Sequence, residues 1–236
     1  MKKIYLIPVL FMFATSMILA QETNKSANED MFSYIPYKSA TWNEKITIES
    51  DAGVNTIQRS VWFKDKKMRT EGTYLDKGTG KEGDQIIIVT AKYMYVIFPE
   101  KKQGIQYSMD SANNPEKEKQ SANKARESAK KTGSEKINGV DCDIYKYSTN
   151  TKNGKNKIYA EITEWRDKTG GFPLKTEKWM KITGEQTGTM KAITEISDLK
   201  INASVPDSKF VPDSDVQIGD MDEMMKANTN QQGQGK

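Results

Sequence analysis

Apolar and polar side chains alternate along residues 157–201, and this alternation predicts three long β-strands in succession. In the first strand Ile158, Ala160 and Ile162 fall on one face and their neighbours on the other, a period of two. The intervening turns are too short for the crossover that parallel strands require. We therefore expect an antiparallel meander.

The same pattern continues through most of the chain and predicts further strands over residues 42–50, 55–64, 67–74, 104–109 and 141–148. The glycine-rich or charged stretches 75–84 and 150–156 are expected to be loops. In the last strand of the meander the apolar parity changes between Ile196 and Leu199, which predicts a bulge or a switch of packing near Ser197.

Residues 86–89 and 93–98 form the most apolar hairpin of the sequence. Their hydrophobicity is continuous rather than alternating, which indicates strands that are covered on both faces.

By contrast, the one helix that the sequence predicts, near residues 115–131, is polar. It begins with Asn114 as the cap and Pro115 at the first helical position, and its only apolar stripe is made of alanines. We expect it to face solvent.

Residues 1–20 have the pattern of a secretory signal, with a basic start, an apolar run and Ala20 before the cleavage site. A retained membrane helix is the alternative. We expect a chain exported to the periplasm, or to the cell surface or medium, with no stable transmembrane insertion.

After residues 1–20 the sequence predicts three parts: an N-terminal segment over 21–40, one β domain over 41–215, and a disordered acidic and polar tail over 216–236. The aromatic residues of the N-terminal segment are expected to contact the body of the protein.

The charge and composition of the chain argue against nucleic-acid binding, catalysis and metal binding. Without residues 1–20 the chain has 34 Lys and Arg against 32 Asp and Glu, interspersed, so nucleic acid is not an expected partner. The absence of histidine removes Ser-His-Asp and Cys-His catalysis and the usual zinc sites. Glu161 and Glu164, the best carboxylate pair, lie on opposite strand faces and cannot act on one bond. We expect neither an enzyme nor a cofactor, and no metal site among the acidic residues 213–222.

The single cysteine, Cys142, cannot form an internal disulfide. Its flanking residues, Asp141 and Asp143, would raise the pKa of its thiol rather than lower it. We expect a buried, unreactive side chain.

Several short motifs between about residues 40 and 215 carry a family resemblance: Trp62-Phe63-Lys64, Tyr93-Met94-Tyr95-Val96, Gly139-Val140-Asp141-Cys142, Gly171-Phe172-Pro173-Leu174 and Asp207-Ser208-Lys209-Phe210-Val211-Pro212. Together with the signal and the antiparallel strands, they make the chain resemble the LolA-like superfamily of exported bacterial proteins. The resemblance implies a mainly β fold with a strongly curved antiparallel sheet, an incomplete barrel whose apolar concave face takes an acyl chain or a lipoprotein anchor. Because the helix near 115–131 lacks the apolar inner side of a carrier's lid, a member that senses or binds without shuttling lipoproteins is equally compatible.

The expected function is therefore a non-enzymatic periplasmic binding or carrier protein. Its partners would be a lipid or acyl chain and a lipoprotein or another envelope protein. The candidate lining residues, of which only one strand parity can face the ligand, are Ile86, Ile88, Tyr93, Tyr95, Ile97, Ile158, Ile162, Leu174 and Met180. The alternative is a structural or protein-binding β domain without a small-molecule ligand.

Overall fold

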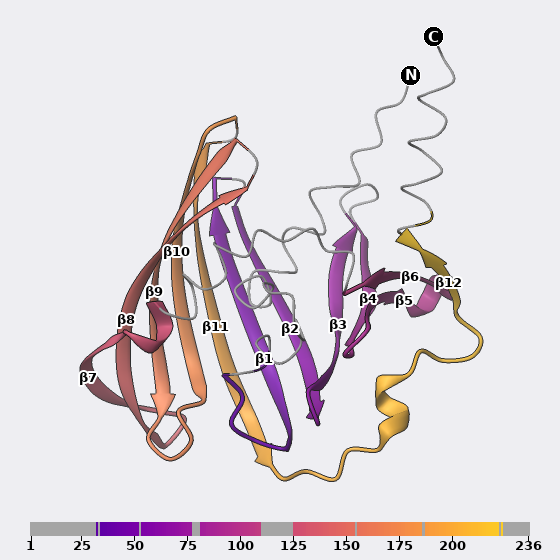
Figure 1. Cartoon of the computed structure of the whole chain (residues 1–236), viewed down its shortest axis with the longest axis horizontal. Coiled ribbons are helices and arrows are strands. Elements are labelled where there is room, and N and C mark those ends of the chain that lie inside the picture. Colours follow the sequence, from indigo (N-terminus) through magenta and orange to yellow (C-terminus); the bar gives the residue numbers. More distant parts are fainter. Residues whose placement is uncertain are drawn as a thin grey trace. The chain divides into compact units, whose positions relative to one another are not determined.

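The computed structural model describes Phe32, residues 34–51, 53–76, 81–109, 125–153, 155–185 and 187–221, and Glu223. The described residues are mainly β. They form a sheet with the strand order β12-β6-β5-β4-β3-β2-β1-β11-β10-β9-β8-β7, in which β12 and β7 are the two edges (Figure 1). The expectation of a mainly β chain built on a large antiparallel sheet is confirmed.

Twelve strands are present in the described part of the chain, and their bounds follow. They are β1 (Ser39–Ser50), β2 (Gly53–Lys64), β3 (Lys67–Asp76), β4 (Lys81–Val89), β5 (Tyr93–Phe98), β6 (Gln103–Ser108), β7 (Lys130–Ile137), β8 (Val140–Asn153), β9 (Asn156–Asp167), β10 (Pro173–Thr183), β11 (Gly188–Ile201) and β12 (Gln217–Asp220). Two short 3₁₀ helices, η2 (Pro99–Lys101) and η3 (Asp207–Phe210), lie in connections.

The predicted meander is present as β9, β10 and β11, which pair antiparallel in sequence order. Tight turns join several other neighbours. Asp65 and Lys66 both take positive φ between β2 and β3, as do Asn138 and Gly139 between β7 and β8, and this geometry matches the twist of a two-residue hairpin. Near the predicted bulge in β11, Asp198 takes a φ of 53°, so the strand is irregular beside Ser197.

Two predicted loops are wrong in part. Strands β3 and β4 pair as far as Asp76 and Lys81, inside the stretch expected to be a loop over 75–84. Strands β8 and β9 likewise pair to Asn153 and Asn156. Polar residues lack the apolar alternation of a half-buried strand, but the backbone ladder of a neighbouring strand still satisfies their N–H and C=O groups.

The helix predicted at 115–131 and the disordered tail predicted at 216–236 both differ from the structure in part. Most of the helix expected at 115–131 lies outside the described residues; Ala125–Glu127 is helical, but Lys130 and Lys131 already belong to β7. The predicted disordered tail is wrong for Gln217–Asp220, which is β12 and pairs parallel with β6. Its Ile218 packs beside Gly104, where an added Cβ would lie 2.7 Å from the isoleucine Cδ1 atom, so the glycine makes room for this strand.

The chain divides into two compact units. Unit 1 comprises residues 1–36, 46–56 and 114–195, and unit 2 comprises residues 37–45, 57–113 and 196–236. In unit 2 the apolar face formed by Ile88 and Ile97 is covered by the chain's own C-terminal residues, among them Val205 and Phe210. In unit 1 the described N-terminal residues Phe32 and Ile35 are buried.

Candidate functional site

In unit 1 the strands β8, β9, β10 and β11 lie side by side (Figure 1). Their register places side chains in transverse rows on one face, which we call the β8–β11 face. Directly opposed residues of antiparallel strands point to the same side of the sheet. Successive rows therefore lie two residues, or about 6.7 Å, apart along the strands. In order along the strands, the rows are Tyr145, Glu164, Thr176 and Thr194; then Tyr147, Ile162, Lys178 and Ala192; then Thr149, Ala160, Met180 and Met190; then Thr151, Ile158 and Ile182.

The rows of the β8–β11 face differ in polarity. Its first row is polar, whereas Ala160, Ile162 and Met180 form a buried apolar cluster against which Tyr147 and Met190 pack. All of these described residues belong to strands of the sheet. On the opposite face Trp179 has 39% of its surface accessible, although Trp165, near the other end of β9, is buried. The β8–β11 face is thus the apolar side of this part of the sheet.

Lys178 lies within this apolar surface. Its register partners are Ile162 on β9 and Ala192 on β11, both buried, and Lys178 itself is only 8% exposed. Burial lowers the pKa of its ammonium group to about 8. Within the described part of the chain, no hydrogen bond or ion pair reaches this group. Lys178 is therefore a largely buried residue for which the described part of the chain provides no counter-charge.

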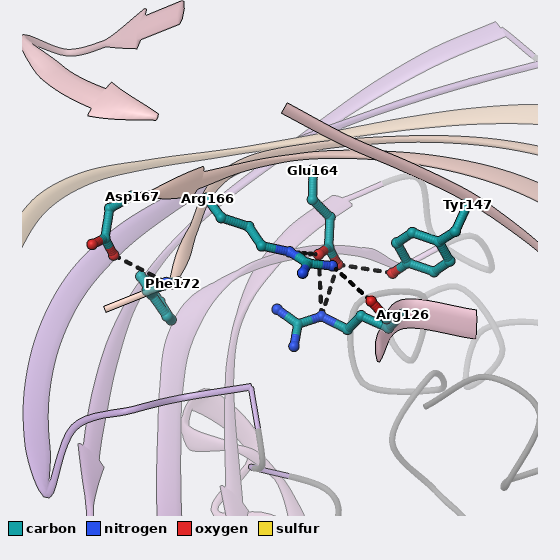
Figure 2. A network of polar contacts seen from close by, with 6 residues as sticks. All are labelled: Arg126, Tyr147, Glu164, Arg166, Asp167 and Phe172. Atoms are coloured by element: carbon teal, nitrogen blue, oxygen red, sulfur yellow. Dashed lines mark hydrogen bonds and ion pairs between the residues drawn. The ribbon is translucent and has the colours of Figure 1, made fainter. Parts of the chain in front are cut away.

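A polar network surrounds Glu164, which lies in the first row (Figure 2). The carboxylate of Glu164, a 6% exposed residue, accepts hydrogen bonds from Arg126 Nε at 3.2 and 3.1 Å and from Arg166 Nε at 2.7 Å. It also accepts a hydrogen bond from the Tyr147 hydroxyl at 2.8 Å. Both carboxylate oxygens are therefore occupied by donors from three residues.

This network has more positive than negative charge. Arg126 and Arg166 both face the single carboxylate of Glu164, and the Nη2 atom of Arg126 is buried without a hydrogen-bond partner in the described residues. Burial and the adjacent carboxylate raise the pKa of Tyr147 well above its usual range, so its hydroxyl stays a donor. Aromatic rings lie beside both guanidinium groups: Tyr145 is 4.4 Å from Arg166 and Tyr34 is 5.9 Å from Arg126.

The turn from β9 to β10 is held by Asp167. Its carboxylate accepts a hydrogen bond from the backbone N–H group of Phe172 at 3.0 Å (Figure 2) and another from that of Thr169 at 2.8 Å. The Phe172 side chain is fully buried. Cys142, paired with Asp167 across β8 and β9, is buried as expected. Burial, followed by the nearby aspartates, raises the pKa of its thiol.

The structure separates the predicted lining residues into two groups. Ile86, Ile88, Tyr95 and Ile97 contribute to the unit 2 face that the C-terminal segment covers, and Tyr93 contacts the ring of Tyr95 at 5.9 Å. Ile158, Ile162 and Met180 share the β8–β11 face. Leu174 is buried in β10 at a register irregularity between Pro173 and Lys175.

Sequence reasoning missed Lys178 and the network around Glu164. A signal for Lys178 was present, because it has the same parity as Met180 and Ile182 in a strand whose exposed parity includes Trp179. The described residues contain no group of three or more acidic or cysteine side chains placed to hold a metal ion. They also contain no helix that is long and apolar enough to cross a membrane.

Comparison with known proteins gives a family. The model of a domain of unknown function, DUF4412, matches residues 45–166, just over half of the chain. The chain belongs to the DUF4412 family. No curated protein matches this DUF4412 chain.

Solved structures similar to the DUF4412 chain are distant. A DUF1329 family protein from Desulfovibrio piger is 12% identical over 89% of this chain and 99% of that chain, with a TM-score of 0.36. LprF from Mycobacterium bovis is 12% identical over 81% of this chain and 95% of that chain, with a TM-score of 0.41. An outer membrane lipoprotein-sorting protein domain from Vibrio parahaemolyticus is 14% identical over 73% of this chain and 88% of that chain, with a TM-score of 0.31.

Proposed function

We propose that the chain is a non-enzymatic, exported binding or carrier protein that holds an acyl chain on the β8–β11 face. The observation that carries the proposal is the composition of the apolar cluster on that face. In the described part of the chain, Ala160, Ile162 and Met180 and the side chains packed on them all belong to strands of the sheet, whereas the corresponding cluster of unit 2 includes Val205 and Phe210 from a covering segment. Pockets that hold apolar ligands are lined mainly by apolar side chains such as these.

The energy of burial supports micromolar binding. A chain of about twelve methylenes gains roughly 0.8 kcal/mol for each buried methylene, or close to 10 kcal/mol in all. Ordering the chain and losing its translational freedom cost several kcal/mol, and what remains corresponds to a dissociation constant in the micromolar range. The two rows beyond Lys178 extend for about 13 Å along the strands, enough to hold much of such a chain.

A titration of the purified, delipidated protein with a fluorescent fatty acid tests the proposal. The variant is Ile182→Asp, at a half-buried position in the last row of the face, and the matched control is Thr183→Asp, the next residue and on the exposed face. We expect saturable binding by the wild type and by Thr183→Asp, and at least tenfold weaker binding by Ile182→Asp. Circular dichroism of all three proteins shows whether folding is retained.

Three outcomes would contradict the proposal. These are absence of saturable uptake by the wild type, unchanged binding by a folded Ile182→Asp variant, and loss of binding only together with loss of folding. In each case the face is ordinary core, and a structural or protein-binding role takes precedence. Native mass spectrometry of protein from its own envelope provides an independent check, with co-purified lipid as the expected result.

A further inference from the structure

We propose that the acyl ligand is a free fatty acid whose carboxylate binds the ammonium group of Lys178, with its hydrocarbon chain along the rows of Met180 and Ile182. This inference rests on the proposed function and adds the chemistry of the head group. It follows from three observations: the position of Lys178 on the face, the excess of positive over negative charge around it, and the apolar rows that lie between Lys178 and Ile182.

Lys178 lies at a boundary on the face. On one side is the row of Glu164 and Thr176, and on the other are the rows that contain Met180 and Ile182. An amphiphile has the same order, a charged head followed by an apolar tail. If the head is at Lys178, the tail can follow only the rows toward Ile182, because the other direction is polar.

The charges near Lys178 leave room for one more anion. Arg126, Arg166 and Lys178 are cations, and Glu164 is the acidic residue of this group. The Glu164 oxygens already accept from the two arginines and from Tyr147. By register Lys178 is diagonal to Glu164, a separation of about 7 Å between Cβ atoms, and no ion pair joins them. A ligand carboxylate would supply the counter-charge that the described residues do not provide.

The dielectric environment makes this pairing effective. Because Lys178 is among Ile162, Ala192 and Met180, water is a poor competitor for its ammonium group. A hydrogen bond between ionised partners in such surroundings is stronger than one between neutral groups. A head group without charge, such as an alcohol, would leave the lysine unpaired and gain much less.

Competition between two ligands of the same chain length tests the inference. A saturated fatty acid and the corresponding fatty alcohol displace a fluorescent acyl probe from the wild type, from Lys178→Met and from Lys181→Met at pH 7. Lys181 is the matched control, since it is exposed on the same strand and points to the opposite face. The expected preference of the wild type for the acid over the alcohol is about 10- to 100-fold. Lys181→Met should keep this preference, and Lys178→Met should reduce it to about one while still binding the alcohol.

The possible outcomes separate this inference from the proposed function. If acid and alcohol bind the wild type equally, or if Lys178→Met keeps the preference, Lys178 is not the head-group site although the face binds acyl chains. If neither ligand displaces or binds, both proposals are wrong and the face is closed by the chain's own residues. A lysophospholipid that binds more tightly than the fatty acid, and loses this advantage in Lys178→Met, would overturn the carboxylate in favour of a phosphate head.

Discussion

Replacing Lys178 with methionine should stabilise the protein. In the folded chain the pKa of Lys178 is about 8, against 10.5 for an unperturbed lysine. A difference of about 2.5 pKa units corresponds to roughly 3 kcal/mol of preference for the neutral form, because each unit is about 1.4 kcal/mol. At pH 7 the lysine is charged in both states, so the folded state bears this penalty in full. Methionine is similar in length and apolar, and it suits neighbours such as Ile162 and Ala192.

The pH dependence gives the same reasoning a second test. Between pH 8 and pH 10.5 the unfolded chain holds its Lys178 proton while the folded chain releases it, so the free energy of unfolding of the wild type rises with pH. Urea denaturation of both proteins at pH 7, 8, 9 and 10 should therefore show an advantage of Lys178→Met of about 1–3 kcal/mol at pH 7 that shrinks as pH rises. Tyr147 remains in both proteins, so its own titration cancels in the comparison. A Lys178→Met variant that is less stable than the wild type at pH 7, or an advantage that is independent of pH, would refute the argument.

Three further predictions concern the structure around the site. Glu164→Ala leaves two half-buried arginines without their counter-charge and should cost about 2–4 kcal/mol in chemical denaturation, whereas Glu161→Ala, on the exposed face, should cost less than about 1 kcal/mol; equal effects would contradict the network. Asp167→Ala removes the acceptor for the buried backbone N–H of Phe172 and should lower the free energy of unfolding by about 1–3 kcal/mol, and no change in the urea midpoint would argue against this role. Cys142→Ala should lower the free energy of unfolding by about 1–2 kcal/mol through lost packing and leave ligand binding intact. The thiol of the folded protein should react with a thiol reagent far more slowly than that of the unfolded chain, and comparable rates would exclude burial.

The strands were predictable because their apolar residues recur with a period of two. Ile158, Ala160 and Ile162 alternate with polar residues, and the short turns around them leave the antiparallel arrangement as the expected one. The same criterion failed at the ends of hairpins. Asp76 and Lys81 pair although neither stretch is apolar, because strand pairing there is maintained by backbone hydrogen bonds, which leave no pattern in the side chains.

The candidate site was harder to predict for two physical reasons. The first is that a strand pattern does not say what covers a face, so Ile88 and Ile97 were indistinguishable in the sequence from Ile162 and Met180. Only the structure shows that Val205 and Phe210, more than a hundred residues later in the chain than Ile97, pack on the first pair. The second is that the Glu164 network joins residues from separate elements, and the sequence does not indicate which cations meet a given carboxylate.

Lys178 itself connects stability with function. If the β8–β11 face were only core, an apolar residue at this position would satisfy Ile162, Ala192 and Met180 and would avoid a penalty of roughly 3 kcal/mol. That penalty is a large part of the 5–15 kcal/mol by which a typical domain is stable. An anionic ligand offsets it, because pairing raises the pKa of Lys178 again and removes the cost of an isolated buried charge. On this argument the chain without ligand is destabilised at the point where the fatty-acid head binds, and saturating fatty acid should raise the unfolding midpoint of the wild type more than that of Lys178→Met.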